Sequence, residues 1–359
     1  GDRPRALRHL RRYLTISEQL AAAHPVSATY QAEVSYAHGN LGVMHEEAGE
    51  IDRALAEYRV AADLDRQRVA HEPRNAKWQN DLAISLNRYG ALLQMTGALA
   101  DSEKVFDEEL ALRRLLVAAA PHDAQRMGRL AVTLGYRGVL QQMMGNTANA
   151  RASFQEELGL LTTLAALDPT NVSARRNRAV SEARLASLLR DDMPRALAMS
   201  GHAVAELREI STKDARPGWR RDLAVIMQRD AALRLAAGDS RAARDEVRQA
   251  LAVLEPMAAA DPRNPQNART FCQALLTAAD AEERIGAPAA ARMYRMRAAA
   301  LAANAQHDPW MTAWRAYALA SLGRHDEAAR LAAQLLAIGY RDGDIASLVK
   351  PPPRTAAAS

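Results

Sequence analysis

Apolar residues recur at helical intervals over residues 76–121, with one short interruption. In residues 76–95 they lie among polar side chains, at Leu82, Ile84, Leu86, Leu92 and Leu93. Residues 96–101 break this pattern, residues 102–120 resume it, and Pro121 ends it. Because amphipathic helices show this spacing, the segment predicts two helices joined by a tight turn.

The same two-helix segment repeats along the chain. Turn residues recur at intervals of 46 to 48 residues, at Gly1, Gly49, Gly97, Gly145, Asp191, Gly238 and Gly286. Prolines recur in step, at Pro25, Pro73, Pro121, Pro169, Pro217, Pro262 and Pro309. A regular period of this length predicts stacked helical hairpins, and such arrays usually bind other molecules.

Small and aromatic residues share this period. Glycine interrupts three first helices, at Gly42, Gly90 and Gly138. Glycine inside a helix costs up to about 1 kcal/mol, so we expect close helix packing there. Alanine follows most turn residues by five positions, as at Ala54 and Ala150, with Ser102 as the exception.

Aromatic residues follow the alanine position by four residues in three units, at Tyr58, Phe106 and Phe154. We expect these rings to fill the gap to the next hairpin. The fourth unit differs: counted back from its turn at Asp191, the small position falls on Arg184. The sequence therefore predicts looser packing in that unit.

Together these positions resemble the tetratricopeptide repeat, in a long variant of about 48 residues. The joining segments also resemble that variant, in which an Asp-Pro-x-Asn loop leads into Trp-x-x-Asp-Leu-Ala. They read EPRNAKWQNDLA up to Ala83 and ARPGWRRDLA up to Ala224. The resemblance implies an all-α, right-handed α-α superhelix of about seven hairpins, and arrays of this kind often adjoin signalling domains such as Ser/Thr kinases.

The period also divides the chain. We expect a truncated first repeat over residues 1–25, five to six long hairpins over 26–309, a short hairpin and cap over 310–349, and a disordered tail over 350–359. Gly1 falls on the turn position, so the first hairpin lacks its first helix, and we interpret the chain as a fragment of a larger multidomain protein. Self-association through this end is a further expectation.

Composition adds little to this interpretation. The net charge is +5, but arginines alternate with acidic residues along the helices, so we do not expect nucleic acid as a partner. Cys272 stands alone and lies in an apolar segment, which indicates a core residue. No apolar run is long enough to cross a membrane, and we expect a cytoplasmic protein.

Candidate chemistry is sparse, and we expect no catalytic residues, no metal and no cofactor. His38 and His45 are seven residues apart, which is not the spacing of a helical zinc motif. The acidic pairs at 108–109 and 156–157 recur with the repeat. A periodic pair favours a solvated helix face or a salt link between neighbouring hairpins over a catalytic site.

The resemblance places first helices on the concave side of the array. Candidate groove residues, chosen by position, are Asn40, Glu47, Asn87, Arg88, Gln94, Tyr136, Gln141 and Gln142. The expected function is a non-catalytic scaffold that binds a peptide segment, a protein surface or an upstream domain of the same chain. Two alternatives stay open: the regulatory region of a bacterial Ser/Thr kinase, and an RNA-binding helical repeat.

Overall fold

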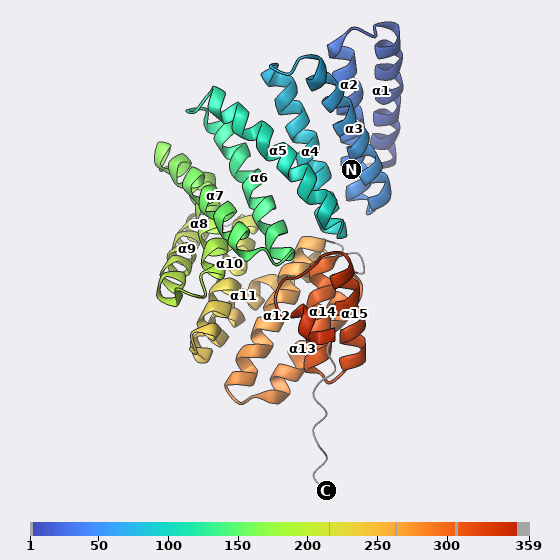
Figure 1. Cartoon of the computed structure of the whole chain (residues 1–359). Coiled ribbons are helices and arrows are strands. Elements are labelled where there is room, and N and C mark those ends of the chain that lie inside the picture. The colour runs from blue at the N-terminus through green and yellow to red at the C-terminus, as the bar shows by residue number, and fades with distance from the viewer. Residues whose placement is uncertain (1–2, 215, 263, 306–307, 350–359) are drawn as a thin grey trace. The chain divides into compact units, whose positions relative to one another are not determined.

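The computed structural model describes residues 3–214, 216–262, 264–305 and 308–349, and within these ranges it is helical without strands (Figure 1). The first eight helices are α1 (Arg3–Ala23), α2 (Ala28–Glu47), α3 (Ile51–His71), α4 (Ala76–Thr96), α5 (Leu99–Ala119), α6 (Ala124–Met143), α7 (Thr147–Leu167) and α8 (Val172–Leu188). They are followed by α9 (Met193–Lys213), α10 (Pro217–Ala236), α11 (Ser240–Ala260), α12 (Pro265–Arg284), α13 (Pro288–Ala302), α14 (Pro309–Ser321), α15 (His325–Ala337) and the 3-10 helix η1 (Ile345–Val349). The tail over 350–359 and the turn position Gly1 lie outside the described residues.

The chain forms two compact units, residues 1–137 and 138–359, which we call unit 1 and unit 2. Consecutive helices from α1 to α5 and from α7 to α15 pack on one another, as α2 does on α3 and α10 on α11. Unit 2 has a further set of contacts, in which first helices touch one another: α8 with α10, α10 with α12, and α12 with α14. First helices therefore form the inner row of unit 2.

Glycine ends the first helices, as predicted. The turn glycines after the first helices within the described residues have a left-handed backbone, with φ of 74° at Gly49, 86° at Gly97, 77° at Gly145, 90° at Gly238 and 83° at Gly286. Only glycine adopts this conformation at little cost. Asp191 has no such φ; there α8 ends at Leu188, and Asp192 caps α9 by accepting from the amide of Arg195.

The joining loops start the first helices through asparagine caps. Asn75 accepts from the amides of Lys77 and Trp78, Asn171 from that of Ala174, and Asn264 from those of Gln266 and Asn267. Side-chain acceptors at this position satisfy amides that a helix start leaves unpaired. The proline series is less uniform than predicted, because Pro217 and Pro309 open α10 and α14 rather than closing the helix before.

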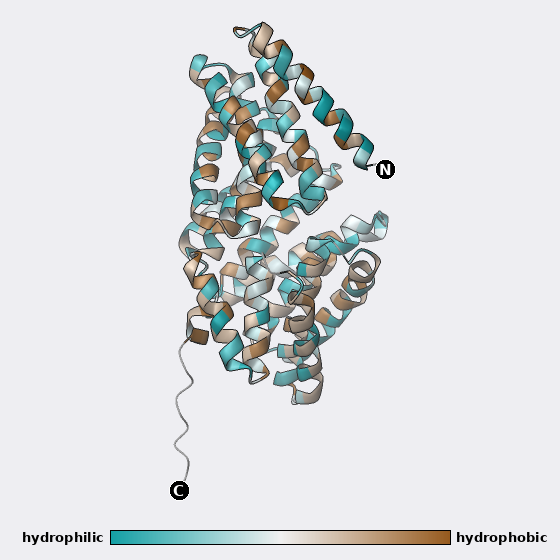
Figure 2. Ribbon diagram, turned by 90° about the vertical axis from the view of Figure 1, so that its right-hand side faces the viewer, coloured by the Kyte–Doolittle hydropathy of each residue, from teal (hydrophilic) through white to brown (hydrophobic). Residues whose placement is uncertain are grey.

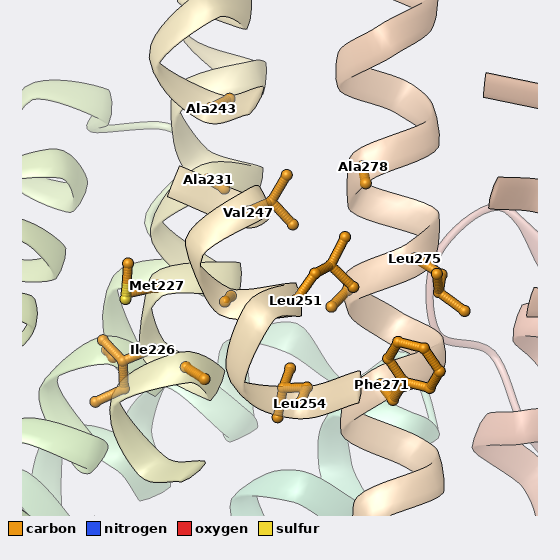
Figure 3. Close-up of a cluster of buried hydrophobic side chains, with 14 of the residues drawn as sticks. Ile226, Met227, Ala231, Ala243, Val247, Leu251, Leu254, Phe271, Leu275 and Ala278 are labelled. Atoms are coloured by element: carbon orange, nitrogen blue, oxygen red, sulfur yellow. The ribbon is translucent and has the colours of Figure 1, made fainter. Parts of the chain in front are cut away.

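Each long helix buries one face, and brown and teal positions alternate along single helices in Figure 2. The largest core lies in unit 2, where α11 sits between α10 and α12 (Figure 3). Val247 and Leu251 of α11 pack between Met227 of α10 and Leu275 of α12. Each helix thus needs both neighbours to bury its apolar residues, as in other repeat arrays.

The glycines inside the first helices accommodate an aromatic ring. A Cβ placed on Gly42 would lie 2.5 Å from the Tyr58 ring, and one on Gly138 would lie 2.5 Å from the Phe154 ring. Each ring thus packs on the glycine of its own hairpin, rather than only toward the next one as we predicted. The Phe106 ring packs on Gly90 of its own hairpin and also stacks on Tyr136 of the next one, with ring centroids 5.8 Å apart.

In the hairpin of α8 and α9, the small position is filled by Ala186 and not by Arg184 as predicted. Ala186 occupies the fifteenth position of α8, the same position as Gly138 in α6, and it is fully buried. Arg184 lies two residues earlier and pairs with Glu157 at 3.4 Å. The prediction failed because it counted back from the turn residue. In this hairpin the turn residue comes two positions earlier than in the others, so the small position is found by counting from the helix start.

Candidate partner-binding surface

First helices of unit 1 carry two positions that are exposed or partly exposed, the ninth and the thirteenth residue of each helix. These positions are one helical turn apart and therefore share a face. We call this set the unit 1 stripe: Tyr36 and Asn40 of α2, Ile84 and Arg88 of α4, and Val132 and Tyr136 of α6. Tyr36, Val132 and Tyr136 are 64%, 52% and 40% exposed.

Neighbouring helices hold the stripe residues in place. Arg88 donates to the backbone oxygen of Gly39 in α2 at 3.4 Å, and Tyr136 stacks on Phe106 of α5. Tyr36 packs edge-to-face on Tyr13 of α1, and Asn40 donates to the Tyr36 carbonyl at 2.9 Å. The stripe thus presents ordered apolar and hydrogen-bonding side chains to solvent.

Not all predicted groove residues share this face. Asn87 donates to Glu109 of α5 at 3.1 Å, Gln94 is buried, and Gln141 is buried while accepting from Ser153 at 2.8 Å. These three amides belong to the packing between helices. Glu47 is exposed at the end of α2 and lies 3.8 Å from Arg3.

The sequence reasoning missed the ninth position. Tyr36, Ile84 and Val132 are 48 residues apart, and Val180 and Val225 continue the series in unit 2. Their shared period could have revealed them. They were overlooked because an apolar residue in a helix is normally assigned to the core.

The periodic acidic pairs divide into two roles. Glu109 is fully buried and accepts from Thr133 at 2.8 Å, and Glu157 is buried and accepts from Ser181 at 3.0 Å. Each bond joins one hairpin to the next. The predicted salt link between hairpins is confirmed for Glu157, which also pairs with Arg184 at 3.4 Å, whereas Glu109 pairs with Arg113 of its own helix. Burial raises the pKa of both carboxyl groups, although hydroxyl donors and nearby arginines oppose it.

Glu108 lies on the solvated helix face, which is the other role predicted for these acidic pairs. It pairs with Arg66 of α3 at 2.7 Å and is partly exposed. The same division applies at Glu156, which is exposed, and Glu157, which is buried.

The other candidate groups have structural partners. His38 contacts Glu57 at 2.6 Å and His45 contacts Glu50 at 2.5 Å, so the two rings do not converge. Cys272 is a buried core residue, and burial raises its pKa to about 12. Within the described ranges, no group of three or more His, Cys, Asp or Glu side chains could hold a metal ion. None of the described helices combines the length and apolarity needed to cross a bilayer.

In two first helices of unit 2, α8 and α10, the thirteenth position is basic, whereas in α12 it is Thr277. Arg184 of α8 and Arg229 of α10 occupy it, beside Val180 and Val225 at the ninth. Burial and the nearby charge of Arg184 lower the pKa of Arg229 to about 10, and Asp342 opposes this shift. Gln142, a predicted groove residue, interacts with the Asp342 side chain and opposes the rise in its pKa.

No family model and no curated protein sequence matches the chain. Solved structures do match it. The apo form of RapI aligns over 94% of this chain and 87% of its own, with 10% identity and a TM-score of 0.52. A tetratricopeptide repeat protein from Parabacteroides merdae aligns over 88% of this chain and 97% of its own, with 14% identity and a TM-score of 0.40. A Rap protein complexed with competence and sporulation factor aligns over 88% of this chain and 99% of its own, with 14% identity and a TM-score of 0.46. At these identities the likeness concerns the fold alone, which is an all-α helical repeat array.

Proposed function

We propose that the chain is a non-catalytic scaffold whose unit 1 stripe binds an extended peptide segment or a protein surface. The observation that carries this proposal is the exposure of large apolar side chains at one helical position in α2 and α6, beside Asn40, Arg88 and Tyr136. Isolated apolar residues on a surface need no explanation, but an ordered row of them is typical of interaction sites.

The chemistry of the stripe favours a peptide over a small molecule. Apolar positions on successive helices suit alternate side chains of an extended partner, and Arg88, Asn40 and the Tyr136 hydroxyl suit its backbone or polar side chains. The stripe residues are already held by Gly39, Phe106 and Tyr13. Binding therefore orders few side chains and loses little entropy.

A regulatory role fits this proposal. The tetratricopeptide arrays that this chain resembles often adjoin signalling domains, so the partner recognised by the stripe would be brought to such a domain. A Ser/Thr kinase is the specific form that the resemblance implies.

Affinity capture with the purified chain tests the proposal. The wild-type chain is compared with Arg88→Ala and Tyr136→Ala, and the captured proteins are identified by mass spectrometry. Leu115→Ala is the matched control, because Leu115 is 58% exposed but lies on α5, a second helix. We expect both stripe variants to lose partners that the control retains. Capture that is unchanged in both stripe variants would contradict the proposal.

A further inference from the structure

The face that carries the unit 1 stripe continues toward the starts of the same helices. The second, sixth, ninth and thirteenth residues of a helix follow the spacing i, i+4, i+7 and i+11, so they share one face. The second and sixth positions are Thr29 and Glu33 in α2, Lys77 and Asp81 in α4, and Gln125 and Arg129 in α6. These residues set the charge of the surface that lies beside the stripe.

The carboxylates on this face already have partners within unit 1. Asp81 accepts from Arg68 of α3 at 3.1 Å, and Glu33 accepts from a tyrosine hydroxyl of α1. Glu47, the last residue of α2, lies 3.8 Å from Arg3 of α1. The negative charge of the face is therefore directed at neighbouring helices of the chain itself.

The cations on this face have no such partners. Among the residues that the structure describes, no carboxylate forms an ion pair with Lys77, Arg88 or Arg129. Lys77 and Arg88 are exposed, and Arg129 is partly exposed. The hydrogen bond that Arg88 donates goes to a neutral acceptor, the backbone oxygen of Gly39. The face thus offers unpaired positive charge to solvent, on α4 and on α6.

The sixth position changes sign along unit 1. It is acidic in α2 and α4, as Glu33 and Asp81, but it is Arg129 in α6. Burial lowers the pKa of Arg113 in α5, and the nearby positive charge of Arg129 adds to this, against Glu109 at 3.3 Å. A carboxylate brought by a partner would therefore relieve repulsion between two arginines, and it would pair with Arg129 through charge-assisted hydrogen bonds.

The side chains between these cations favour a peptide over a nucleic acid. The ninth position is aliphatic in α4 and α6, as Ile84 and Val132. Aliphatic side chains offer no ring on which a base could stack, and the Tyr136 ring is already stacked on Phe106. Surfaces that bind single-stranded nucleic acid combine cations with free aromatic rings. Aliphatic pockets beside cations suit apolar and acidic side chains of a peptide.

We propose that the unit 1 stripe recognises an acidic peptide segment. Its apolar side chains contact the ninth positions, and its Asp or Glu side chains pair with Arg88 and Arg129. Charge complementarity of this kind steers association and rejects partners of the wrong sign. The inference rests on the proposed function, because it names the chemistry of the partner that the same surface binds.

Peptide selection on the full chain tests the inference. The probe is a phage-displayed library of random peptides about twelve residues long, which reach about 40 Å when extended and can cross several helices. Selected peptides are synthesised, and their binding is measured by fluorescence anisotropy. Peptides that lose affinity in both Tyr36→Ala and Tyr136→Ala are counted as dependent on the stripe.

We expect the peptides that depend on the stripe to be negatively charged and to combine Asp or Glu with apolar residues. The double variant Arg88→Glu, Arg129→Glu should bind them about tenfold or more weakly, because repulsion replaces attraction. Selection on this variant should yield peptides rich in Lys or Arg, which would also show that its stripe is folded. The matched control is Arg59→Glu with Lys104→Glu, which changes the net charge equally through exposed residues of α3 and α5. The control should keep the preference for acidic peptides.

The outcomes separate this inference from the proposed function. Neutral or basic peptides that depend on the stripe would overturn the inference and leave the proposed function standing. If neither tyrosine variant weakens any selected peptide, the proposed function fails as well. Binding of a labelled oligouridine that depends on the stripe and is tighter than that of the peptides would overturn the inference in favour of single-stranded RNA.

Discussion

The Phe154 ring lies in the space that a side chain on Gly138 would need. A Cβ at Gly138 would be 2.5 Å from Cε1 and 2.8 Å from Cδ1 of that ring, and the ring is 1% exposed. The glycine in α6 is thus required by the aromatic residue of α7, which shares its hairpin.

Gly138→Ala should therefore destabilise the protein despite the higher helix propensity of alanine. Overpacking costs about 1–3 kcal/mol, and the propensity gain returns about 1 kcal/mol at most. We expect a net loss of about 1–2 kcal/mol in the free energy of unfolding, measured by urea denaturation. Gly159→Ala is the control, because Gly159 is exposed inside α7 with no neighbouring atom near its Cβ position. The Gly159→Ala variant should gain up to about 1 kcal/mol in the free energy of unfolding. Equal effects of the two substitutions would mean that the Phe154 ring does not require glycine at position 138.

Glu157 should make stability depend on pH. Burial raises the pKa of its carboxyl above the ordinary 4.5, so the folded state holds this proton more tightly than the unfolded state. The contribution of Glu157 to stability is then greatest below about pH 4.5 and declines as pH rises through its folded pKa.

Glu157→Gln removes this decline, so the variant should gain stability relative to wild type as pH rises above about 4.5. Urea denaturation across that range measures the difference. Glu156→Gln changes the exposed neighbour, and its free energy of unfolding should vary with pH in parallel with that of the wild type. A Glu157→Gln curve that also ran parallel would show that the carboxyl titrates normally.

Asn75 should contribute to stability through its helix cap. Its side chain accepts from the amides of Lys77 at 3.1 Å and Trp78 at 3.3 Å. Asn75→Ala should lower the free energy of unfolding by about 1 kcal/mol, whereas Asn75→Ser, which keeps an acceptor, should be close to wild type. Thermal unfolding measures both, and equal losses would mean that the cap bonds are not responsible.

Asp342 should make the packing of residues 340–345 on the end of α6 sensitive to pH. The amides of Arg341 and Asp342 donate there to the backbone oxygen of Met143. Burial raises the pKa of the Asp342 carboxyl to about 6, against the effects of Gln142, Arg190 and Arg229. The docked segment therefore favours the neutral carboxyl, and docking should weaken as pH rises from about 4 to about 6. Tyr317 and Tyr340 also face this carboxyl, and burial keeps both hydroxyls neutral over this range.

Hydrogen exchange at the Arg341 and Asp342 amides, corrected for its intrinsic pH dependence, measures this docking. Protection should fall across that interval in the wild-type chain. In Asp342→Asn it should stay constant. A fall of equal size in the variant would assign the effect to another group.

The fold could be predicted because its signals are local. The turn glycines, the asparagine caps and the helices over 76–95 and 102–121 each depend on residues within a few positions of one another. The structure places α4 at Ala76–Thr96 and α5 at Leu99–Ala119, so only the length of the break differs.

The site was harder to predict because it depends on distance in space. Gln141 and Gln142 are adjacent in sequence, yet one is buried against Ser153 and the other reaches Asp342. Only the rotation of α6 and the return of residues 340–345 to its end distinguish them. The contact between Met143 and Arg341 has no sequence signal, because no repeat position connects them.

The bond between a buried carboxylate and the hydroxyl of the next hairpin recurs with the repeat, at Glu109 with Thr133 and at Glu157 with Ser181. Two junctions of the same chemistry are interchangeable, since the surface that α5 offers to α6 matches the surface that α7 offers to α8. Such a protein can change its length during evolution by duplicating or deleting 48 residues at a time, with no need to invent a new interior.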